Sequence, residues 1–282
     1  MPSSMTRHQV QGDLKPLPNI RNIIAVGSGK GGVGKSTTTV NLAAAVAAQG
    51  YRVGILDADI YGPSIPTMLG VHGKPQSDDG KHIEPMTGHG MSVMSIGFLV
   101  EEDTPMIWRG PMATSALGTL LNDTLWPELD FLFVDLPPGT GDIQLTLAQK
   151  IPVAGAVIVT TPQDVATLDA RKALKMFEKV EIPVLGIVEN MALHVCSNCG
   201  HAEAIFGEGG GAQMVDTYGV RMLGQLPLQK NIRLQGDLGM PIVLAAPVSE
   251  AALAYRNVAE NLLSALSARP TMKGTLDINV LS

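Results

Sequence analysis

Short, continuous apolar runs recur along this sequence, and segments with helical spacing of their apolar residues lie between them. The runs lie at residues 23–28, 52–57, 92–98, 130–137, 155–162, 183–190 and 221–227. Most of them lack apolar–polar alternation, which is typical of strands covered on both faces in a parallel sheet. The helical segments lie at residues 35–49, 113–126, 142–150, 165–180, 211–218 and 249–266. Repeated strand–helix–strand order with right-handed crossovers predicts an α/β fold, a doubly wound and mostly parallel sheet with helices on both faces.

The sequence predicts a single folded domain. With 282 residues, of which 45% are hydrophobic, the protein can bury a substantial core, and it shows no internal repeat or break in composition. We expect a flexible lead-in over residues 1–20, one domain over residues 21–267 and a loose tail over residues 268–282.

Charge and hydropathy limit the classes of partner. The 20 Lys and Arg residues face 26 Asp and Glu residues, a net charge of -6 that argues against binding nucleic acid or an anionic membrane by charge alone. The N-terminus has no apolar signal-peptide region, and we find no run of about 18 uncharged apolar residues. We therefore expect a cytoplasmic protein.

A glycine-rich segment, GKGGVGKS, lies directly between the first apolar run and the first helical segment. It matches G-x-x-x-x-G-K-[ST] in the strand–loop–helix context that a phosphate-binding loop requires. Glycines let backbone N–H groups approach phosphate oxygens, and the helix N-terminus adds its positive end. Lys35 would reach the β- and γ-phosphates, and the Ser36 hydroxyl would hold Mg²⁺. The expected nucleotide-binding residues of this loop are Gly29, Lys30, Gly31, Gly32, Val33, Gly34, Lys35, Ser36 and Thr37.

Carboxylates follow two other apolar runs, in ILDADIYGPS and FVDLPPGTGD. Ligands of open α/β sheets bind at the carboxyl ends of the strands, so these side chains should converge on the loop. Asp135 is expected to hold Mg²⁺ through water, in the position of a Walker B aspartate. Asp57 would serve the Mg²⁺ shell or hold the loop, and Asp59 is the candidate for orienting an attacking water. Capping a helix or a turn is the alternative role for Asp57 and Asp59.

The loop carries a second lysine, Lys30, in K-G-G-V-G-K-[ST]. This pattern resembles the deviant Walker A signature of the ATPase class that includes MinD, ParA and the nitrogenase iron protein. The resemblance implies that Lys30 reaches the nucleotide of a partner subunit, so that the catalytic residues would be Lys30, Lys35 and Asp59 of a homodimer. A solvated loop charge is the alternative for Lys30. The resemblance also implies that Asn190 hydrogen-bonds adenine, and the lack of a guanine-specific N-K-x-D pattern favours ATP.

The sequence has two cysteines, Cys196 and Cys199, in HVCSNCGH. The pair could be a redox dithiol, although such pairs usually open a helix. It could hold zinc within one subunit together with His194 and His201. It could also supply half of the four thiolates that an iron–sulphur cluster usually needs, so that two subunits bridge one cluster on a two-fold axis.

Taken together, these motifs resemble the Mrp/ApbC family of iron–sulphur carrier ATPases. The matching stretches include GSGKGGVGKSTTTVNLA, WRGPM, DLPPGTGDIQLTLAQ, TTPQDVATLDARKA, GIVENM and CSNCGH. The resemblance implies ATP, Mg²⁺ and a bridging [4Fe–4S] cluster as cofactors, slow ATP hydrolysis, and apo iron–sulphur proteins as recipients. A positioning ATPase of the MinD or ParA kind, an electron-transfer protein and a zinc-stabilised nucleotide switch remain as alternatives.

Overall fold

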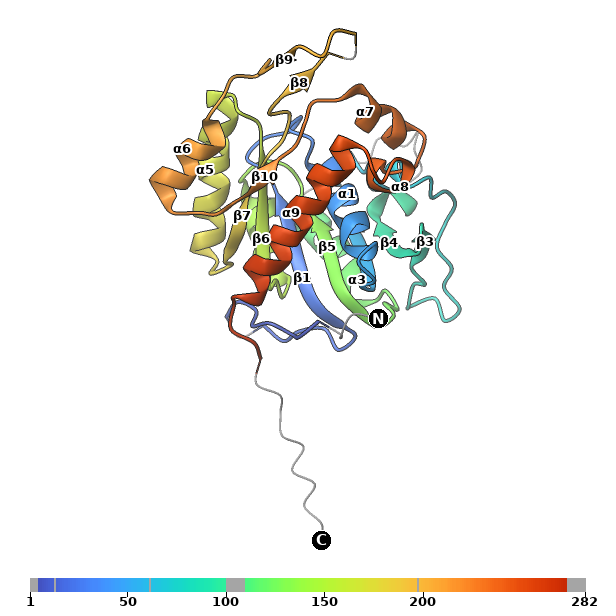
Figure 1. The fold of residues 1–282 in the computed structure, drawn as a ribbon. Helices are drawn as coiled ribbons and strands as arrows, with labels where there is room; N and C mark the ends of the chain where they lie inside the picture. The colour runs from blue at the N-terminus through green and yellow to red at the C-terminus, as the bar shows by residue number, and fades with distance from the viewer. Residues whose placement is uncertain (1–4, 13, 61, 100–109, 197, 273–282) are drawn as a thin grey trace.

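The computed structural model describes residues 5–12, 14–60, 62–99, 110–196 and 198–272. Its main feature is an eight-stranded sheet in the order β10-β7-β6-β1-β5-β2-β4-β3, in which β3 alone is antiparallel among the described strands (Figure 1). These strands are β1 (Ile20–Gly27), β2 (Val53–Asp57), β3 (Met86–Gly88), β4 (Met91–Ser95), β5 (Leu129–Asp135), β6 (Gly155–Thr160), β7 (Val184–Glu189) and β10 (Met222–Gln225). The predicted doubly wound, mostly parallel α/β fold is confirmed.

Helices cover both faces of the sheet. They are α1 (Lys35–Ala47), α2 (Ile65–Met68), α3 (Gly110–Asn122), α4 (Asp142–Lys150), α5 (Asp164–Lys179), α6 (Gly210–Tyr218), α7 (Lys230–Asp237), α8 (Ile242–Ala245) and α9 (Glu250–Ser267). Helices α1 and α9 pack against each other, while α3, α4, α5 and α6 pack in a continuous row (Figure 1). No helix in the described part of the protein is long and apolar enough to cross a membrane.

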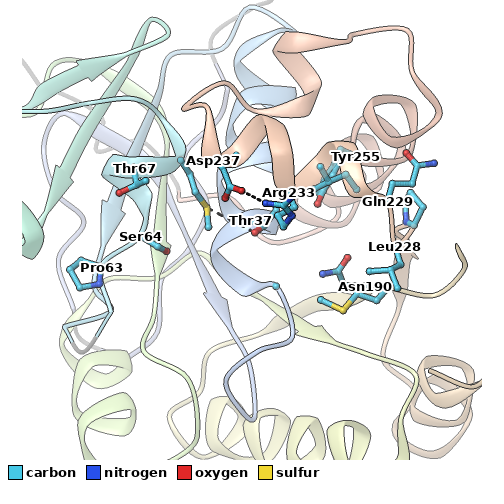
Figure 2. Close-up of a pocket in the computed structure, with 16 residues that line it drawn as sticks. Thr37, Pro63, Ser64, Thr67, Asn190, Leu228, Gln229, Arg233, Asp237 and Tyr255 are labelled. Carbon is cyan, nitrogen blue, oxygen red and sulfur yellow. Dashed lines mark hydrogen bonds and ion pairs between the residues drawn. The ribbon is translucent and has the colours of Figure 1, made fainter. Parts of the chain in front are cut away.

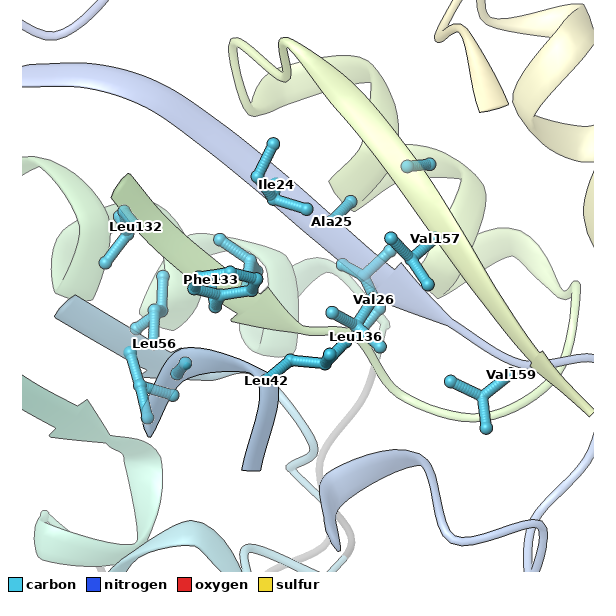
Figure 3. Packing of buried hydrophobic residues seen from close by; sticks show 14 of the residues in the cluster. Ile24, Ala25, Val26, Leu42, Leu56, Leu132, Phe133, Leu136, Val157 and Val159 are labelled. Atoms are coloured by element: carbon cyan, nitrogen blue, oxygen red, sulfur yellow. The ribbon is translucent and has the colours of Figure 1, made fainter. Parts of the chain in front are cut away.

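The core explains why the apolar runs lack alternation. Every residue of β5 and of β6 is buried, because helices shield both sides of these central strands. Figure 3 shows Val26, Leu56 and Phe133, from three neighbouring strands, together with Leu42 of α1. The core thus continues from the sheet into α1, the helix that begins at the phosphate loop.

Strand register brings the candidate acids together at one edge. Asp57 at the end of β2 pairs in register with Asp135 at the end of β5, and Asp135 also pairs with Val26 of β1. The loop that follows β1 therefore begins beside both carboxylates. This is the convergence that the parallel arrangement predicted.

Some elements differ from the sequence-based expectation. The strand expected at residues 92–98 ends at Ser95, where a 3₁₀ turn (Ile96–Phe98) begins. The strand expected at residues 221–227 ends at Gln225, so the following residues leave the sheet. Trp108 and Arg109 of the WRGPM stretch lie outside the described residues.

The described part of the lead-in packs on the domain and is not loose. His8 is buried, and both its backbone N–H and its ring contact Asn22 Oδ1 at 3.0 Å. The Gln11 side chain donates to the carbonyl oxygens of Ala148 and Ile151 at the end of α4. For residues 5–12 this corrects the expectation of a flexible segment, because His8 and Gln11 form hydrogen bonds with polar groups of the domain. The domain limits at residues 21 and 267 stay a prediction.

Candidate nucleotide site and cysteine hairpin

The phosphate loop connects β1 to α1 and is wedged against α5. A Cβ atom on Gly29 would lie 2.1 Å from the backbone carbonyl carbon and oxygen of Asp169, so only glycine fits there. Gly34, the N-cap of α1, has φ 80°, in the left-handed region that favours glycine. Gly31 and Gly32 between them are exposed. The loop thus has the open backbone and the helix N-terminus that bind phosphate.

Asp135 is the centre of a buried polar cluster beneath this loop. Its Oδ2 accepts from Lys35 Nζ at 2.7 Å and from Ser36 Oγ at 2.6 Å, and its Oδ1 accepts from Thr39 Oγ1 at 2.6 Å. Asp135 is fully buried, and Lys35 also lies 3.6 Å from Asp59 Oδ2. Buried charges are stable only when paired and hydrogen-bonded in this way. The hydroxyl of Ser36 and the carboxylate of Asp135 are adjacent oxygen donors, the ligand type that Mg²⁺ prefers, so these residues fit the ion.

Asp57 holds the loop after β2. Its carboxylate accepts from the backbone N–H groups of Asp59 at 3.1 Å and Ile65 at 3.2 Å, and from Ser95 Oγ at 3.1 Å. Burial, followed by repulsion from nearby Asp135, raises the pKa of Asp57 to about 7. These hydrogen bonds give Asp57 the capping role that the sequence analysis named as the alternative, whereas holding the phosphate loop stays a prediction. A role in the Mg²⁺ shell stays a prediction.

Asn190 joins the end of β7 to the phosphate loop. Its Nδ2 donates to the carbonyl oxygen of Val33 at 2.9 Å, and the residue is buried. It lines a cavity of about 560 Å³ that also reaches Gly34 and Thr37 at the start of α1 (Figure 2). This is the place expected for a base that Asn190 would recognise.

Sequence reasoning missed most of the wall of this cavity. The missed lining residues are Pro63, Ser64, Thr67, Met68, Met191, Pro227, Leu228, Gln229, Ile232, Arg233, Gly236, Asp237 and Tyr255. Figure 2 shows the side chains of Leu228 and Gln229 on the same side of the cavity as Asn190. For Pro227, Leu228 and Gln229 the one signal is position, because they follow the end of the parallel strand β10.

Lys30 lies in the loop, half-buried, and its carbonyl oxygen accepts from Ser28 Oγ at 2.9 Å. Within the described residues its ammonium group forms no ion pair and no hydrogen bond. The reach of Lys30 toward a partner subunit stays a prediction.

The two cysteines lie at the tip of a hairpin formed by β8 (His194–Val195) and β9 (Ala202–Glu203). The Cys196 N–H donates to the His201 carbonyl at 2.9 Å, which closes the turn. Both thiols are free; Cys196 is half-buried and Cys199 is exposed. Hydrogen bonds from the backbone N–H groups of Asn198 and then Cys199 lower the pKa of the Cys196 thiol, which favours the thiolate that binds metals.

The hairpin does not collect a complete metal site. No group of three or more His, Cys, Asp or Glu residues that could hold a metal ion occurs in the parts of the protein that the structure describes. His194 is turned to the body of the protein, where its Nδ1 contacts the Leu228 carbonyl at 2.9 Å. The hairpin extends outward from the carboxyl edge of the sheet (Figure 1). Two thiols are therefore presented together at an exposed turn.

Comparison with known proteins gives consistent matches. Residues 19–263 match the ParA family model described as NUBPL iron-transfer P-loop NTPase. The iron–sulfur cluster carrier protein of Escherichia coli K12 is 60% identical over 251 residues, covering 89% of this chain and 68% of that protein. A solved nucleotide-binding protein from Archaeoglobus fulgidus, in complex with ADP, has a TM-score of 0.70 and 43% identity, covering 78% of this chain and 87% of the other. The cell division ATPase MinD of Pyrococcus furiosus, at 22% identity and a TM-score of 0.63, covers 86% of this chain and 98% of its own and shares the fold.

Proposed function

Because the chain belongs to the NUBPL iron-transfer family of P-loop NTPases, we propose that it is an ATP-dependent iron–sulphur cluster carrier. It binds and slowly hydrolyses ATP, holds a [4Fe–4S] cluster between two copies of itself, and passes the cluster to apo-proteins. The observation that carries this proposal is the pair of free thiols, Cys196 and Cys199, at the exposed tip of a hairpin in a chain that also has a phosphate-binding loop. We propose that it acts in the cytoplasm, bound to neither nucleic acid nor membrane, in line with its net charge of -6.

The phosphate half of the proposal follows from the cluster around Asp135. The phosphate oxygens of ATP would accept hydrogen bonds from the backbone N–H groups of the loop. The ammonium group of Lys35, which now lies 2.7 Å from Asp135 Oδ2, would turn to the same phosphate oxygens. Mg²⁺, held by Ser36 and Asp135, would neutralise charge on the β- and γ-phosphates. The carboxylate of Asp59 lies 3.6 Å from the Lys35 ammonium group, close enough to the phosphate loop to orient an attacking water.

The proposal of a homodimer rests on the number of thiolates in one hairpin and on the ammonium group of Lys30. A [4Fe–4S] cluster usually needs four thiolates, and one hairpin supplies two. A two-fold axis that brings two hairpins together supplies the other two and leaves the cluster at the surface, where a recipient can reach it. Lys30, whose ammonium has no ion pair or hydrogen bond within the described residues, is available to reach the nucleotide of the partner.

Anaerobic reconstitution with iron and sulphide tests the carrier function. We expect about four irons per dimer, from four thiolates in two subunits, and transfer of the cluster to an apo-protein. The Cys196→Ser, Cys199→Ser double variant should hold no cluster yet bind ADP as the unsubstituted protein does, because the hairpin tip lies outside the base cavity. One zinc per subunit, or a cluster that persists in the double variant, contradicts the proposal.

A lysine pair tests the dimeric ATPase. Lys30→Ala should abolish hydrolysis and leave ADP binding by the monomer intact, whereas Lys35→Ala should lose both. Mixing Lys30→Ala subunits with Asp59→Asn subunits should restore part of the activity, since one of the two sites then has both residues intact. If no mixture recovers activity, Lys30 does not act across an interface.

A further inference from the structure

The residues that lead into the cysteine hairpin run alongside the segment that follows β10. Leu226 donates its N–H to the Glu189 carbonyl at 2.9 Å, and its own carbonyl accepts from Ala192 at 3.0 Å. The N–H of Leu228 then donates to the Leu193 carbonyl at 2.8 Å. A short ladder of backbone hydrogen bonds thus continues beyond the sheet toward the hairpin.

His194 is the last link of this ladder. Its Nδ1 lies 2.9 Å from the Leu228 carbonyl oxygen, which can only accept, so Nδ1 carries the hydrogen. His194 opens β8 and stands two residues before Cys196. The side chain therefore fixes the stem of the hairpin to Leu228.

The same segment is a wall of the nucleotide cavity. Pro227, Leu228 and Gln229 line it, opposite the start of α1 (Figure 2). Gln229 is also tied outward, because its Nε2 donates to Glu250 Oε2 at 3.1 Å. Leu228 thus touches the cavity with its side chain and holds His194 with its carbonyl group.

The far end of the hairpin is anchored at the same strand end. Glu189, the last residue of β7, is buried and accepts from the Gly211 N–H at 2.5 Å and from Gln225 Nε2 at 2.6 Å. Gly211 lies in the first turn of α6, where the backbone returns from the hairpin. The β8 stem is therefore tied to Leu228, which lines the cavity, and the backbone that follows β9 rejoins the domain at Gly211 beside Glu189. The tip that carries the thiols is exposed.

We propose that residues 226–229 and His194 form a link by which a nucleotide base in the cavity sets the position of Cys196, with His194 as the positioning residue. The inference rests on nucleotide binding as proposed above. A base packed on Pro227 and Leu228 restrains this segment, and through two hydrogen bonds it restrains the stem of the hairpin. Fewer openings of the stem mean slower reaction of the half-buried Cys196 thiol, whereas the exposed Cys199 reacts without an opening. By linkage, if the base strengthens binding of a cluster by the hairpin, the bound cluster strengthens nucleotide binding by the same factor.

Thiol alkylation measures the link directly, since the protein has two cysteines, both at the hairpin tip. Iodoacetamide is reacted with the protein at one fixed pH, with and without saturating Mg-ADP, and mass spectrometry gives the rate at each thiol. In the unsubstituted protein we expect Mg-ADP to slow alkylation of Cys196 about fivefold, the low end of typical coupling between sites, and to change that of the exposed Cys199 little.

Variants of the two hairpin histidines distinguish loss of the His194 hydrogen bond from a general disturbance of the hairpin. In His194→Phe the effect of Mg-ADP on alkylation should vanish while the Kd for ADP stays within about twofold of the original, a change of about 0.4 kcal/mol. His194→Asn, whose Nδ2 can still donate to the Leu228 carbonyl, should restore most of the effect. His201→Phe, at the exposed hairpin position facing Cys196, should keep it in full.

ADP titration of the same samples distinguishes the possible failures. If the unsubstituted protein binds ADP but its alkylation rates do not change, the link is refuted and the carrier proposal stands. If His194→Phe keeps the full ADP effect, His194 is not the positioning residue. If the unsubstituted protein does not bind ADP at all, the proposed function fails and the link fails with it. Should His194→Phe not fold, as judged by circular dichroism, the smaller His194→Ala variant decides, because it also lacks the donor: a full ADP effect there contradicts the role of His194.

Discussion

Replacing Gly29 by alanine would test whether the phosphate loop owes its position to its contact with α5. The new Cβ would lie 2.1 Å from the carbonyl carbon and oxygen of Asp169 and 2.6 Å from the Ala170 nitrogen, whereas ordinary contact begins at 3.4 Å. The loop or the helix must then move by about 1.3 Å, the difference between 3.4 and 2.1 Å. All three atoms belong to the backbone, so no side-chain rotation can relieve the clash.

Two quantities should change. The free energy of unfolding should fall by about 3 kcal/mol, the upper part of the usual range for overpacking. ADP affinity should fall at least about tenfold, or about 1.4 kcal/mol, because the loop amides no longer meet the phosphates. Urea unfolding followed by circular dichroism gives the first quantity, provided that the m-value is unchanged. Calorimetric titration gives the second.

Gly31→Ala is the matched control in the same loop. The nearest atom to its new Cβ would be Pro138 Cγ at 4.0 Å, and the residue is exposed. Its unfolding free energy should stay within about 0.5 kcal/mol of the original. If the two variants are destabilised equally, or if Gly29→Ala is as stable as the unsubstituted protein, the loop is not held by its fit against α5.

Three further substitutions test the packing and the charges. Burial alone would raise the pKa of Asp130, but hydrogen bonds from Arg52 lower it overall. The stabilisation by this carboxylate is therefore present above about pH 4 and is lost as the pH falls further. In Asp130→Asn the free energy of unfolding in urea should depend less on pH between about pH 5 and 3, one unit on either side of the ordinary value. Burial raises the pKa of Tyr255, so above about pH 10 stability should fall by about 1.4 kcal/mol per pH unit from this group, a slope that Tyr255→Phe removes. Phe177 of α5 is fully buried, and Phe177→Ala should cost about 3 to 5 kcal/mol in urea unfolding, whereas Val165→Ala on the same helix, with Val165 64% exposed, should cost less than about 0.5 kcal/mol.

The sheet could be read from the sequence because its signal is local. A run such as residues 130–137 is apolar on both faces, and that property of the sequence requires cover on both sides. Residues 226–229 carry no such signal. They belong to no helix or strand, and their partners, Glu189, Ala192 and Leu193, depend on how β7 and β10 align. Register is a property of two strands together, which one run cannot specify.

The site divides in the same way. The phosphate loop was predictable because its pattern and its strand–helix context are both visible in the sequence. The capping role of Asp57 was one of several open roles, and the partners that show it, Ile65 and Ser95, are placed by tertiary structure. The buried lead-in was missed because a polar, proline-containing segment reads as a linker, and only the position of Asn22 shows that His8 has a buried partner.

The end of β7 lies between the two candidate sites, and two successive residues, the last of the strand and the first of the turn after it, contact one site each. Asn190 donates to the Val33 carbonyl of the phosphate loop, whereas Glu189, one residue earlier, accepts from the first turn of α6, where the hairpin returns. A shift of this strand end would move the loop that binds phosphate and the stem that carries the thiols together. The closeness of the two sites is thus a consequence of where β7 ends, and it places the link through residues 226–229 beside both of them.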